Sequence, residues 1–570
     1  MDVGERLVEL MVSSGVQTGF GVPGGQTAPY YHGMAVHQDE VQHVLMRDER
    51  SAVFAADAYA RTAGKLAACD ATVGPGAANL VSGLVEARAA SIPMIAVVAD
   101  IPRNWEHRRR MGNAAQGFEQ RSFLEPCVKW FGRVEVPEAI DDVYNHAVRV
   151  ANSGRPGPVV IEVPDDVFSA PVEETGVPGA DARFPRSRTA PDPAAVTAAV
   201  RALASADRPV LFVGGGAHLS GAHAEVLALA ERLQVPVVTT ITGKGIVPET
   251  HRLAVGIVGS FGVPVANDVL GTADCVLAIG TKIGQAATVG YDLPASSALV
   301  IHLDIDAEEI GRNSRNFLPL EGDAKLGVQA LLAAAVETAA STWNLPDLAA
   351  RVEAWWAAEA GYKTPLDGDK AKPQEVVRAL AGQIGEDDHV VTDASLSSGW
   401  AGTRWRQSAH GRRLLAPRGV APLGWGLPAA VGTAFALKDI GSAGRTICLA
   451  GDGGWGYSLG EIETLTRFRM PVVSVVLNNS VLGWNKHVAM RRYPDAWVSQ
   501  DFAEVDYAAS AAALGASATR VNSVEEFEIA LEKALSVEDR PSVVEVITSE
   551  FETPVIKAMS GAVASQRTSY

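Results

Sequence analysis

The sequence predicts an α/β protein made of three doubly wound domains, each a parallel sheet covered by helices. Apolar strand-like runs alternate with amphipathic helical segments along most of the chain, which is the rhythm of a parallel sheet with helical crossovers. A chain of 570 residues is too long for one hydrophobic core and suggests about three or four domains. Its 47% hydrophobic and 20% charged residues are typical of folded α/β proteins and argue against a disordered chain.

The first domain is predicted over residues 1–165. Its strand-like apolar runs lie at residues 16–20, 41–46, 95–98 and 159–163. A stretch rich in proline and charge, residues 164–193, has no clear period and is predicted to be a linker.

The central domain is predicted over residues 190–338, with strands at 209–213 and 300–303. Residues 340–373 are predicted to form a helix and a linker that carry Trp343, Trp355 and Trp356. The third domain is predicted over residues 370–550, with strands at 390–392, 446–450 and 472–477. The small, polar tail, residues 551–570, is predicted to be either a disordered end or a lid over a site.

The formal net charge of −17 argues against nucleic acid or a membrane surface as a partner, because both are anionic. The four cysteines are far apart and form no CxxC or Cys/His cluster, which argues against a zinc site and against a disulfide framework. Reduced thiols favour the cytoplasm. The first residues have neither a basic region nor a long apolar run, so no signal peptide or membrane span is expected.

The strongest motif lies in the third domain, where Gly451-Asp452-Gly453 is followed after twenty-four residues by Asn478-Asn479. A helix and a strand lie between them, so both polar ends follow neighbouring parallel strands and meet at the carboxyl edge of the sheet. A carboxylate and an amide oxygen, completed by a main-chain carbonyl just beyond, suit a Mg²⁺ ion that holds a diphosphate. The glycines allow close backbone approach, and the helix N-terminus favours the anion.

With its interval, this motif resembles the signature of thiamine diphosphate (ThDP)-dependent enzymes, and the chain as a whole resembles the acetolactate synthase family. The resemblance implies Asp452, Asn479 and the carbonyl of Val481 as Mg²⁺ ligands. It also implies diphosphate-side contacts from Gly451, Gly453, Gly454, Leu482 and Gly483. Alone, the Gly-Asp-Gly triplet would indicate only a strand-to-helix turn.

A second segment, residues 46–61, runs from a strand end into a helix. It resembles the family segment whose glutamate reaches the aminopyrimidine ring of ThDP, which places Glu49 in that role. A carboxyl group bonded to the ring nitrogen favours the imino tautomer, and that imine removes the proton from the thiazolium carbon. The alternative is a helix N-terminal acid stabilised by the helix dipole.

Two glycine-rich loops resemble the loops of the family's first domain that line the pyrimidine pocket. The first includes Pro23 and Gly24, and the second includes Gly74 and Asn79. Either loop alone would indicate only a tight turn.

Residues 421–430 resemble the family segment that supplies a bulky apolar wedge beneath ThDP. By that match Leu423 bends the cofactor so that its imine meets the reactive carbon, a near-attack geometry that lowers the barrier. The alternative is an ordinary core leucine. Upstream, the turn of Asp393, Ala394 and Ser395 matches a turn that contacts the diphosphate, with Ser395 as the better donor.

The substrate side departs from the family pattern. Many relatives carry Ala-Phe-Gln-Glu where this chain has Ala-Ala-Gln-Gly at residues 114–117. Gln116 is retained, while the changed residues on either side of it suggest a bulkier or differently shaped substrate. The alternative is that Gln116 is a plain loop residue. Asp70 is placed to face the thiazolium and return a proton, or is a surface-strand acid. His487 starts a helix that overhangs the site in relatives, although a lone histidine is more often structural.

Two weaker signals concern nucleotides. Gly214-Gly215-Gly216 follows a strand and suggests a dinucleotide site, but a lone glycine run is weak evidence. Flavin-binding relatives resemble one another in an Arg-Phe-Asp-Asp-Arg stretch where this chain has residues 280–285, so FAD is not expected. The basic run at residues 103–110 suggests either a site for a phosphate-bearing substrate such as a CoA thioester or a solvated loop.

The resemblance implies a ThDP- and Mg²⁺-dependent enzyme that decarboxylates a 2-oxo acid and joins the product to a second carbonyl. A 2-hydroxyacyl-CoA lyase and a simple 2-oxo acid decarboxylase are alternatives on the same scaffold. A catalytically silent homologue is a third, which the retained Glu49, Asp452 and Asn479 disfavour. Sites of this family form between subunits, which implies a homodimer or a homotetramer.

Overall fold

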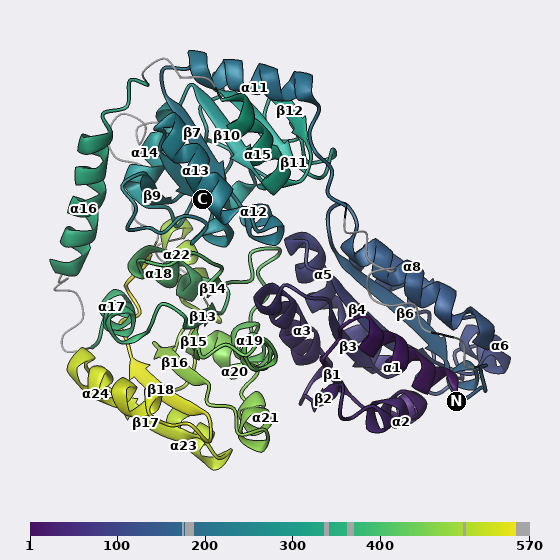
Figure 1. Ribbon diagram of the computed structural model, residues 1–570. Helices are drawn as coiled ribbons and strands as arrows, with labels where there is room; N and C mark the ends of the chain where they lie inside the picture. The colour runs from purple at the N-terminus through teal and green to yellow at the C-terminus, as the bar shows by residue number, and fades with distance from the viewer. Residues whose placement is uncertain (174–175, 177–186, 336–340, 362–369, 494–497, 555–570) are drawn as a thin grey trace.

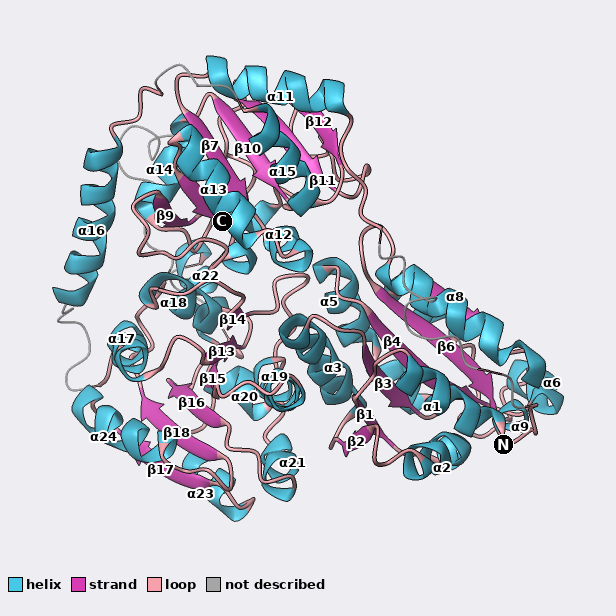
Figure 2. Cartoon of the chain, viewed as in Figure 1, coloured by secondary structure: helices cyan, strands magenta, loops and turns pink. Residues whose placement is uncertain are grey.

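The computed structural model of the chain describes residues 1–173, 176, 187–335, 341–361, 370–493 and 498–554. It contains three six-stranded sheets, one in each domain, and every strand pair is parallel. Helices lie on both sides of each sheet (Figure 2). The predicted fold class is confirmed. No described helix is long and apolar enough to cross a membrane.

The N-terminal domain has the strand order β2-β1-β3-β4-β6-β5. All seven residues of β4 and of β6 are buried, because helices cover both faces of the sheet. The strands are β1 (Thr18–Val22), β2 (Gln42–Leu45), β3 (Ala67–Ala71), β4 (Met94–Asp100), β5 (Trp130–Arg133) and β6 (Pro158–Pro164). The helices are α1 (Val3–Ser13), α2 (Ala28–Val36), α3 (Glu49–Ala63), α4 (Pro75–Asn79), α5 (Val81–Ala90), α6 (Glu106–Arg110), α7 (Arg121–Leu124), α8 (Ile140–Asn152) and α9 (Asp165–Phe168).

The central domain has the strand order β12-β11-β10-β7-β8-β9 and its own hydrophobic cores. Its strands are β7 (Pro209–Val213), β8 (Val237–Thr239), β9 (Ala254–Ile257), β10 (Cys275–Ile279), β11 (Leu299–Asp304) and β12 (Phe317–Glu321). Its helices are α11 (Pro193–Ser205), α12 (Gly215–Ser220), α13 (His223–Leu233), α14 (Pro264–Thr272) and α15 (Ala324–Ala334), followed by α16 (Leu345–Gly361) on the way to the third domain.

The C-terminal domain has the strand order β14-β13-β15-β16-β18-β17. Its strands are β13 (His389–Thr392), β14 (Leu414–Leu415), β15 (Thr446–Gly451), β16 (Val473–Asn478), β17 (Ser517–Val521) and β18 (Ser542–Ile547). Its helices are α17 (Pro373–Gln383), α18 (Leu396–Arg404), α19 (Gly426–Asp439), α20 (Asp452–Gly456), α21 (Glu461–Arg467), α22 (Gly483–Arg492), α23 (Tyr507–Ala513) and α24 (Val524–Leu535).

The N-terminal and C-terminal domains share one hydrophobic core, to which α3 and α19 both contribute. These two helices lie side by side between the two sheets (Figure 1). At Gly432 of α19 a Cβ atom would lie 1.9 Å from the carbonyl oxygen of Ala55 on α3, so only glycine allows this approach. The residues that follow β2 and β15 are therefore held by one packed unit.

The structure corrects some predicted boundaries. Two N-terminal strands, β3 and β5, were not predicted, and β6 and α9 occupy the start of the predicted linker. Residues 174–175 and 177–186 of that linker lie outside the described residues, as do residues 555–570 of the tail. All four cysteines are buried and free, as expected.

Candidate active site

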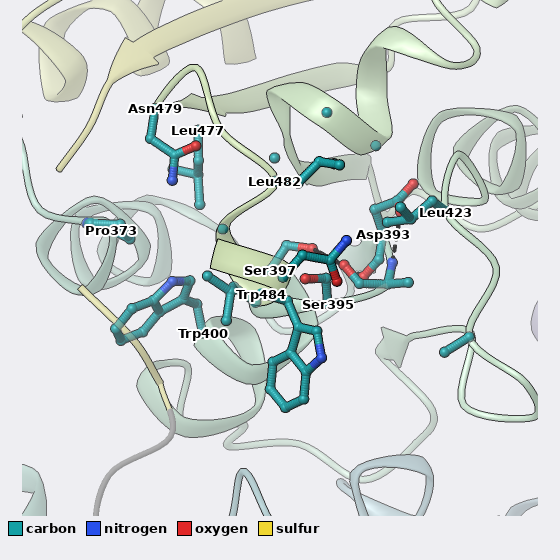
Figure 3. A pocket seen from close by; sticks show the side chains of 18 of the residues that line it. Pro373, Asp393, Ser395, Ser397, Trp400, Leu423, Leu477, Asn479, Leu482 and Trp484 are labelled. Carbon is teal, nitrogen blue, oxygen red and sulfur yellow. Dashed lines mark hydrogen bonds between the residues drawn. The ribbon is translucent and has the colours of Figure 1, made fainter. Parts of the chain in front are cut away.

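A pocket of about 540 Å³ lies at the carboxyl edge of the third sheet. Asp393 follows β13, Asp452 follows β15 and Asn479 follows β16, and these strands are neighbours. Figure 3 shows side chains from these strand ends around the pocket. The predicted residues that line it are Asp393, Ala394, Ser395, Leu423, Gly451, Asp452, Gly453, Gly454, Asn479, Val481, Leu482 and Gly483.

The chemistry of this pocket fits a divalent cation at Asp452. That side chain is 2% exposed, and its Oδ2 has no hydrogen-bond partner among the described residues. Burial raises the pKa of the carboxyl to about 6, while backbone N–H groups act in the opposite direction. A buried carboxylate oxygen without a partner is costly unless a cation meets it.

Neutral oxygen atoms would have to complete the ligands of a cation at Asp452. The described residues hold no cluster of three or more His, Cys, Asp or Glu side chains suited to a metal. Asn479 and Val481 line the same pocket, and the Asn479 Oδ1 accepts a long bond of 3.3 Å from the Val481 N–H. One carboxylate with amide and carbonyl oxygens suits Mg²⁺, which keeps water or phosphate in its other positions.

Asp393 holds the pocket loops together, while the predicted diphosphate contact of the turn at Asp393, Ala394 and Ser395 stays a prediction. Its carboxylate accepts hydrogen bonds from the backbone N–H groups of Ala394 at 2.8 Å, Gly424 at 3.2 Å and Gly426 at 2.8 Å. At Gly454 a Cβ atom would lie 2.7 Å from this carboxylate, so the approach requires glycine. Asp393 thus fixes the turn beside Leu423, and Ser395 remains the candidate donor in the pocket.

Leu423 is not an ordinary core leucine. It is half-buried, and its side chain lines the pocket beside Asp393 (Figure 3). The preceding loop is held by the buried Glu86 of α5, whose carboxylate accepts the N–H groups of Gly419, Val420 and Ala421 at 2.9, 2.7 and 3.1 Å. The N-terminal domain thereby positions Leu423 within the same chain.

Glu49 lies at the start of α3, where Asp48 caps the helix by accepting the Arg50 N–H at 2.7 Å. The Asn79 amide donates to the Glu49 carboxylate at 2.9 Å, and a Cβ at Gly76 would lie 3.0 Å from it. Glu49 is half-buried and does not line the 540 Å³ pocket. Within one chain, Glu49 therefore lies outside the lining of the pocket that contains Asp452.

The predicted pyrimidine-side loops meet around this glutamate. Gly74 has φ of +73°, and a Cβ there would lie 2.2 Å from the carbonyl oxygen of Gln116. At Gly24, which follows Pro23, a Cβ would lie 2.1 Å from Thr72 Oγ1. Since both approaches require glycine, the two loops and the Gln116 segment form one closely packed edge.

Three thiamine pyrophosphate enzyme models match the chain: the N-terminal TPP binding domain over residues 1–123, the central domain over 196–331 and the C-terminal TPP binding domain over 393–546. The probable acetolactate synthase large subunit of Methanocaldococcus jannaschii is 31% identical over 95% of this chain and 91% of its own length. The chain belongs to the thiamine diphosphate-dependent enzymes, in the acetolactate synthase-like family. The acetolactate synthase of Arthrospira platensis is 33% identical over 93% of this chain and 91% of its own. The corresponding large subunit of Parasynechococcus marenigrum is also 33% identical, over 90% and 82%.

In this ThDP enzyme Asp70 is neither a surface acid nor part of the described pocket. It is fully buried in β3, and its carboxylate accepts hydrogen bonds from Tyr31 at 2.6 Å and interacts with His43 at 2.8 Å. Both oxygens are thus engaged inside the N-terminal domain. The predicted proton-return role finds no support in this geometry.

His487 lies on α22, whose Trp484, Asn485 and Val488 line the pocket while His487 does not. The helix overhangs the site as predicted, but different side chains face the cavity. A catalytic role for His487 stays a prediction.

No sequence pattern pointed to Gln120 or Glu86, which hold loops that are distant from them in the chain. Gln120 is fully buried, accepts the Gly74 N–H at 2.7 Å and donates to Glu162 at 2.9 Å. Both side chains accept hydrogen bonds from backbone N–H groups of loops that border the site. Such hydrogen bonds leave no local sequence pattern.

Proposed function

We propose that this enzyme uses ThDP and Mg²⁺ to decarboxylate a 2-oxo acid and to join the product to a second carbonyl compound. The observation that carries the proposal is the buried, unpartnered Asp452 oxygen in a pocket shared with Asn479 and Val481, beside Leu423. The acetolactate synthase names of the relatives support the same reaction.

ThDP, when bound, supplies a nucleophilic carbon and stabilises negative charge next to the former carbonyl. The chain's own residues would hold it: Asp452, Asn479 and the Val481 carbonyl through Mg²⁺, and Ser395 with Gly453 and Gly454 at the diphosphate. Leu423, fixed by Asp393 and Glu86, would set the bend of the cofactor.

Glu49 would hold a proton at the ring nitrogen of the aminopyrimidine, which favours the tautomer that acts as base. Apolar side chains on the other wall of the pocket, Trp400, Trp484 and Val488, would exclude water from the reacting carbon. Gln116, whose backbone lies beside Gly74, would contact the substrate at the pyrimidine edge.

A homodimer, or a homotetramer built from such dimers, would unite the two halves of the site. Glu49 does not line the pocket that contains Asp452 in one chain, and family sites form between subunits. The Glu49 edge of one chain would then close the pocket of another. The free, buried cysteines support a cytoplasmic location.

The test is to incubate the purified enzyme with pyruvate, ThDP and Mg²⁺ and to identify the product. Acetolactate is the expected product, whereas acetaldehyde alone would favour a simple decarboxylase. No product from pyruvate would favour the acyl-CoA lyase alternative. Calorimetric titration with ThDP, with and without Mg²⁺, tests the silent-homologue alternative, which requires that no metal-dependent binding occurs.

A further inference from the structure

The helix α22 forms one wall of the cofactor pocket. Its Trp484, Asn485 and Val488 line the pocket (Figure 3), and Phe261 of the central domain lies edge-on to Trp484 with the ring centroids 5.6 Å apart. None of the residues 482–490 is fully buried. Because a helix with so little buried surface is weakly held by apolar packing, its position over the pocket requires another anchor.

Lys486 of α22 supplies such an anchor. Its Nζ donates hydrogen bonds to Asp501 Oδ1 at 2.6 Å and to Glu550 Oε2 at 2.5 Å. The Lys486 side chain is 13% exposed, and those of Asp501 and Glu550 are 60% and 24% exposed. Burial disfavours the charged lysine, but the two hydrogen bonds outweigh burial and raise its pKa.

Asp501 belongs to a segment that pairs with the loop before α22. The Leu482 N–H donates to the Gln500 carbonyl at 2.8 Å, and the Phe502 N–H donates to the Ser480 carbonyl at 2.7 Å. These backbone bonds hold the loop whether or not Lys486 is present. The bond from Lys486 to Asp501 therefore ties the helix to a segment that is already fixed.

The same segment touches the metal half of the site. At Gly453, next to Asp452, a Cβ atom would lie 3.2 Å from the Phe502 ring and 3.0 Å from the Leu482 side chain. The Asp501 segment is thus packed against the turn that carries the candidate Mg²⁺ ligand. Lys486 joins this turn to the opposite wall of the pocket.

Glu550 comes from a third segment, the chain that follows β18. This strand pairs with β16, and the Thr548 N–H just beyond it donates to the Asn478 carbonyl at 2.8 Å. Exposed ion pairs contribute little to stability, which limits the share of Asp501. Glu550 is better shielded from water than Asp501, so its charge-assisted bond to Lys486 is the stronger of the two.

We propose that Lys486 is a positioning residue that holds α22 against the cofactor pocket through Glu550 and Asp501, and that this hold favours carbon–carbon bond formation over release of an aldehyde. The second part rests on the proposed function. With α22 in place, Trp484 and Val488 keep water from the carbon that has lost CO₂. When α22 moves away, that carbon takes a proton from water instead of joining the second carbonyl carbon, and the product leaves as the aldehyde.

The hold on α22 is tested by hydrogen–deuterium exchange of the full-length enzyme without cofactor. In Lys486→Gln the amides of α22 should exchange about tenfold faster than in wild type, as expected for the loss of charge-assisted hydrogen bonds. Peptides of β16 and β18 should exchange as in wild type. Lys486→Arg keeps the charge and should keep most of the protection. Lys533→Gln, which removes an exposed lysine of α24 that lines no described pocket, is the matched control and should change nothing.

A double variant shows whether the effect comes from the ion pair. Glu550→Gln alone should speed the exchange of α22, but adding it to Lys486→Gln should give no further increase, because the pair is already lost. Full additivity of the two changes, or wild-type exchange of α22 in Lys486→Gln, would overturn the proposal. If Lys486→Gln does not fold, Asp501→Asn combined with Glu550→Gln removes the same two bonds and should give the same faster exchange.

The effect on the reaction is the ratio of acetaldehyde to acetolactate formed from pyruvate. Lys486→Gln should raise this ratio about tenfold, in step with the opening of α22, and Lys486→Arg should bring it back towards wild type. Affinity for ThDP with Mg²⁺ should change little, because backbone bonds hold the loop at residues 480–482. Faster exchange with an unchanged product ratio would overturn the positioning role. Wild-type enzyme that forms no acetolactate would remove the proposed function, and the exchange of α22 would still decide whether Lys486 holds the helix.

Discussion

The two halves of the ThDP site differ in how far one chain completes them. On the C-terminal side, Asp452 is 2% exposed, lines the 540 Å³ pocket and has an oxygen without a partner among the described residues. On the N-terminal side, Glu49 is half-buried, bonds to the exposed Asn79, and lines no described pocket. The C-terminal half therefore contains a formed pocket. The N-terminal half is a half-exposed edge that a second surface would have to cover.

Under the proposed function, metal and diphosphate binding would be a property of one chain, while proton transfer at the rings would require two. Yet the N-terminal domain also acts on its own chain, because Glu86 holds the loop before Leu423. Each N-terminal domain would then contribute to two active sites. Glu86 of α5 would hold the loop before Leu423 in its own chain, and Glu49 at the start of α3 would reach the cofactor bound by another chain. Variants that alter only one half test this difference.

The largest effect is expected for Glu49→Gln. The amide cannot hold the proton at the ring nitrogen, so turnover should fall by about 10²–10⁴-fold, the usual contribution of acid–base catalysis. Affinity for ThDP and Mg²⁺ should change little, because the diphosphate half is untouched. Initial rates and calorimetry measure the two effects, with the exposed Glu463→Gln as control. A wild-type rate in Glu49→Gln would remove the assigned role.

A smaller effect, on binding, is expected for Asp452→Asn. The variant keeps the size of the side chain but removes the charge that would meet Mg²⁺, so affinity for ThDP in the presence of Mg²⁺ should fall about 10–100-fold. The difference between titrations with and without Mg²⁺ should shrink accordingly. Unchanged metal dependence would place the cation elsewhere.

A mixing experiment tests whether the halves belong to different chains. Glu49→Gln and Asp452→Asn chains are mixed under conditions that allow subunits to exchange, and activity is assayed at a ThDP concentration that saturates wild type but leaves the Asp452→Asn enzyme mostly without cofactor. In a mixed dimer one site carries both defects and the other carries none, so activity should recover to about a quarter of wild type. If each site formed within one chain, no mixture would regain activity.

The sequence correctly predicted that three polar residues of the C-terminal pocket lie at strand ends, because each follows a continuous apolar run; their cofactor contacts stay predictions. Asp393, Asp452 and Asn479 stand directly after β13, β15 and β16. The N-terminal half was predicted less well. The strand β3 is built of Ala-Ala-Cys-Asp-Ala, which has little β propensity and includes a buried acid. The sequence shows only that residue Asp70 is an acid. Its bonds to Tyr31 and His43 arise from tertiary packing and leave no sequence pattern.

Gln120 and Glu86 escaped prediction for the same reason. Their partners are backbone N–H groups of loops 46 and more than 300 residues away, at Gly74 and at Gly419. Neither position carries a periodicity or motif. Sequence patterns therefore identified the groups that would touch the cofactor, and only the fold identified the groups that position them.

The last prediction concerns stability rather than activity, at the contact by which the C-terminal domain holds the strand end before Glu49. Glu461 is 1% exposed, and its carboxylate accepts the Arg47 N–H at 3.1 Å and the Thr464 hydroxyl at 2.7 Å. Burial raises the pKa of Glu461 to about 7 from its ordinary value of 4.5. The folded state thus favours the protonated form, so this group should lower the stability of the enzyme progressively as pH rises from about 4.5 to about 7.

Glu461→Gln replaces the carboxyl with a neutral side chain of the same shape and removes that pH-dependent loss. Below about pH 4.5 the variant and wild type should have similar melting temperatures, and the variant should become relatively more stable up to about pH 7, by at most ~3 kcal/mol in the free energy of unfolding. The control Glu463→Gln should show a small opposite trend, because the nearby Arg467 lowers the pKa of that exposed carboxyl. A melting-temperature difference between Glu461→Gln and wild type that stays constant across this range would mean that Glu461 is ionised in the folded enzyme, with its charge balanced at the domain boundary.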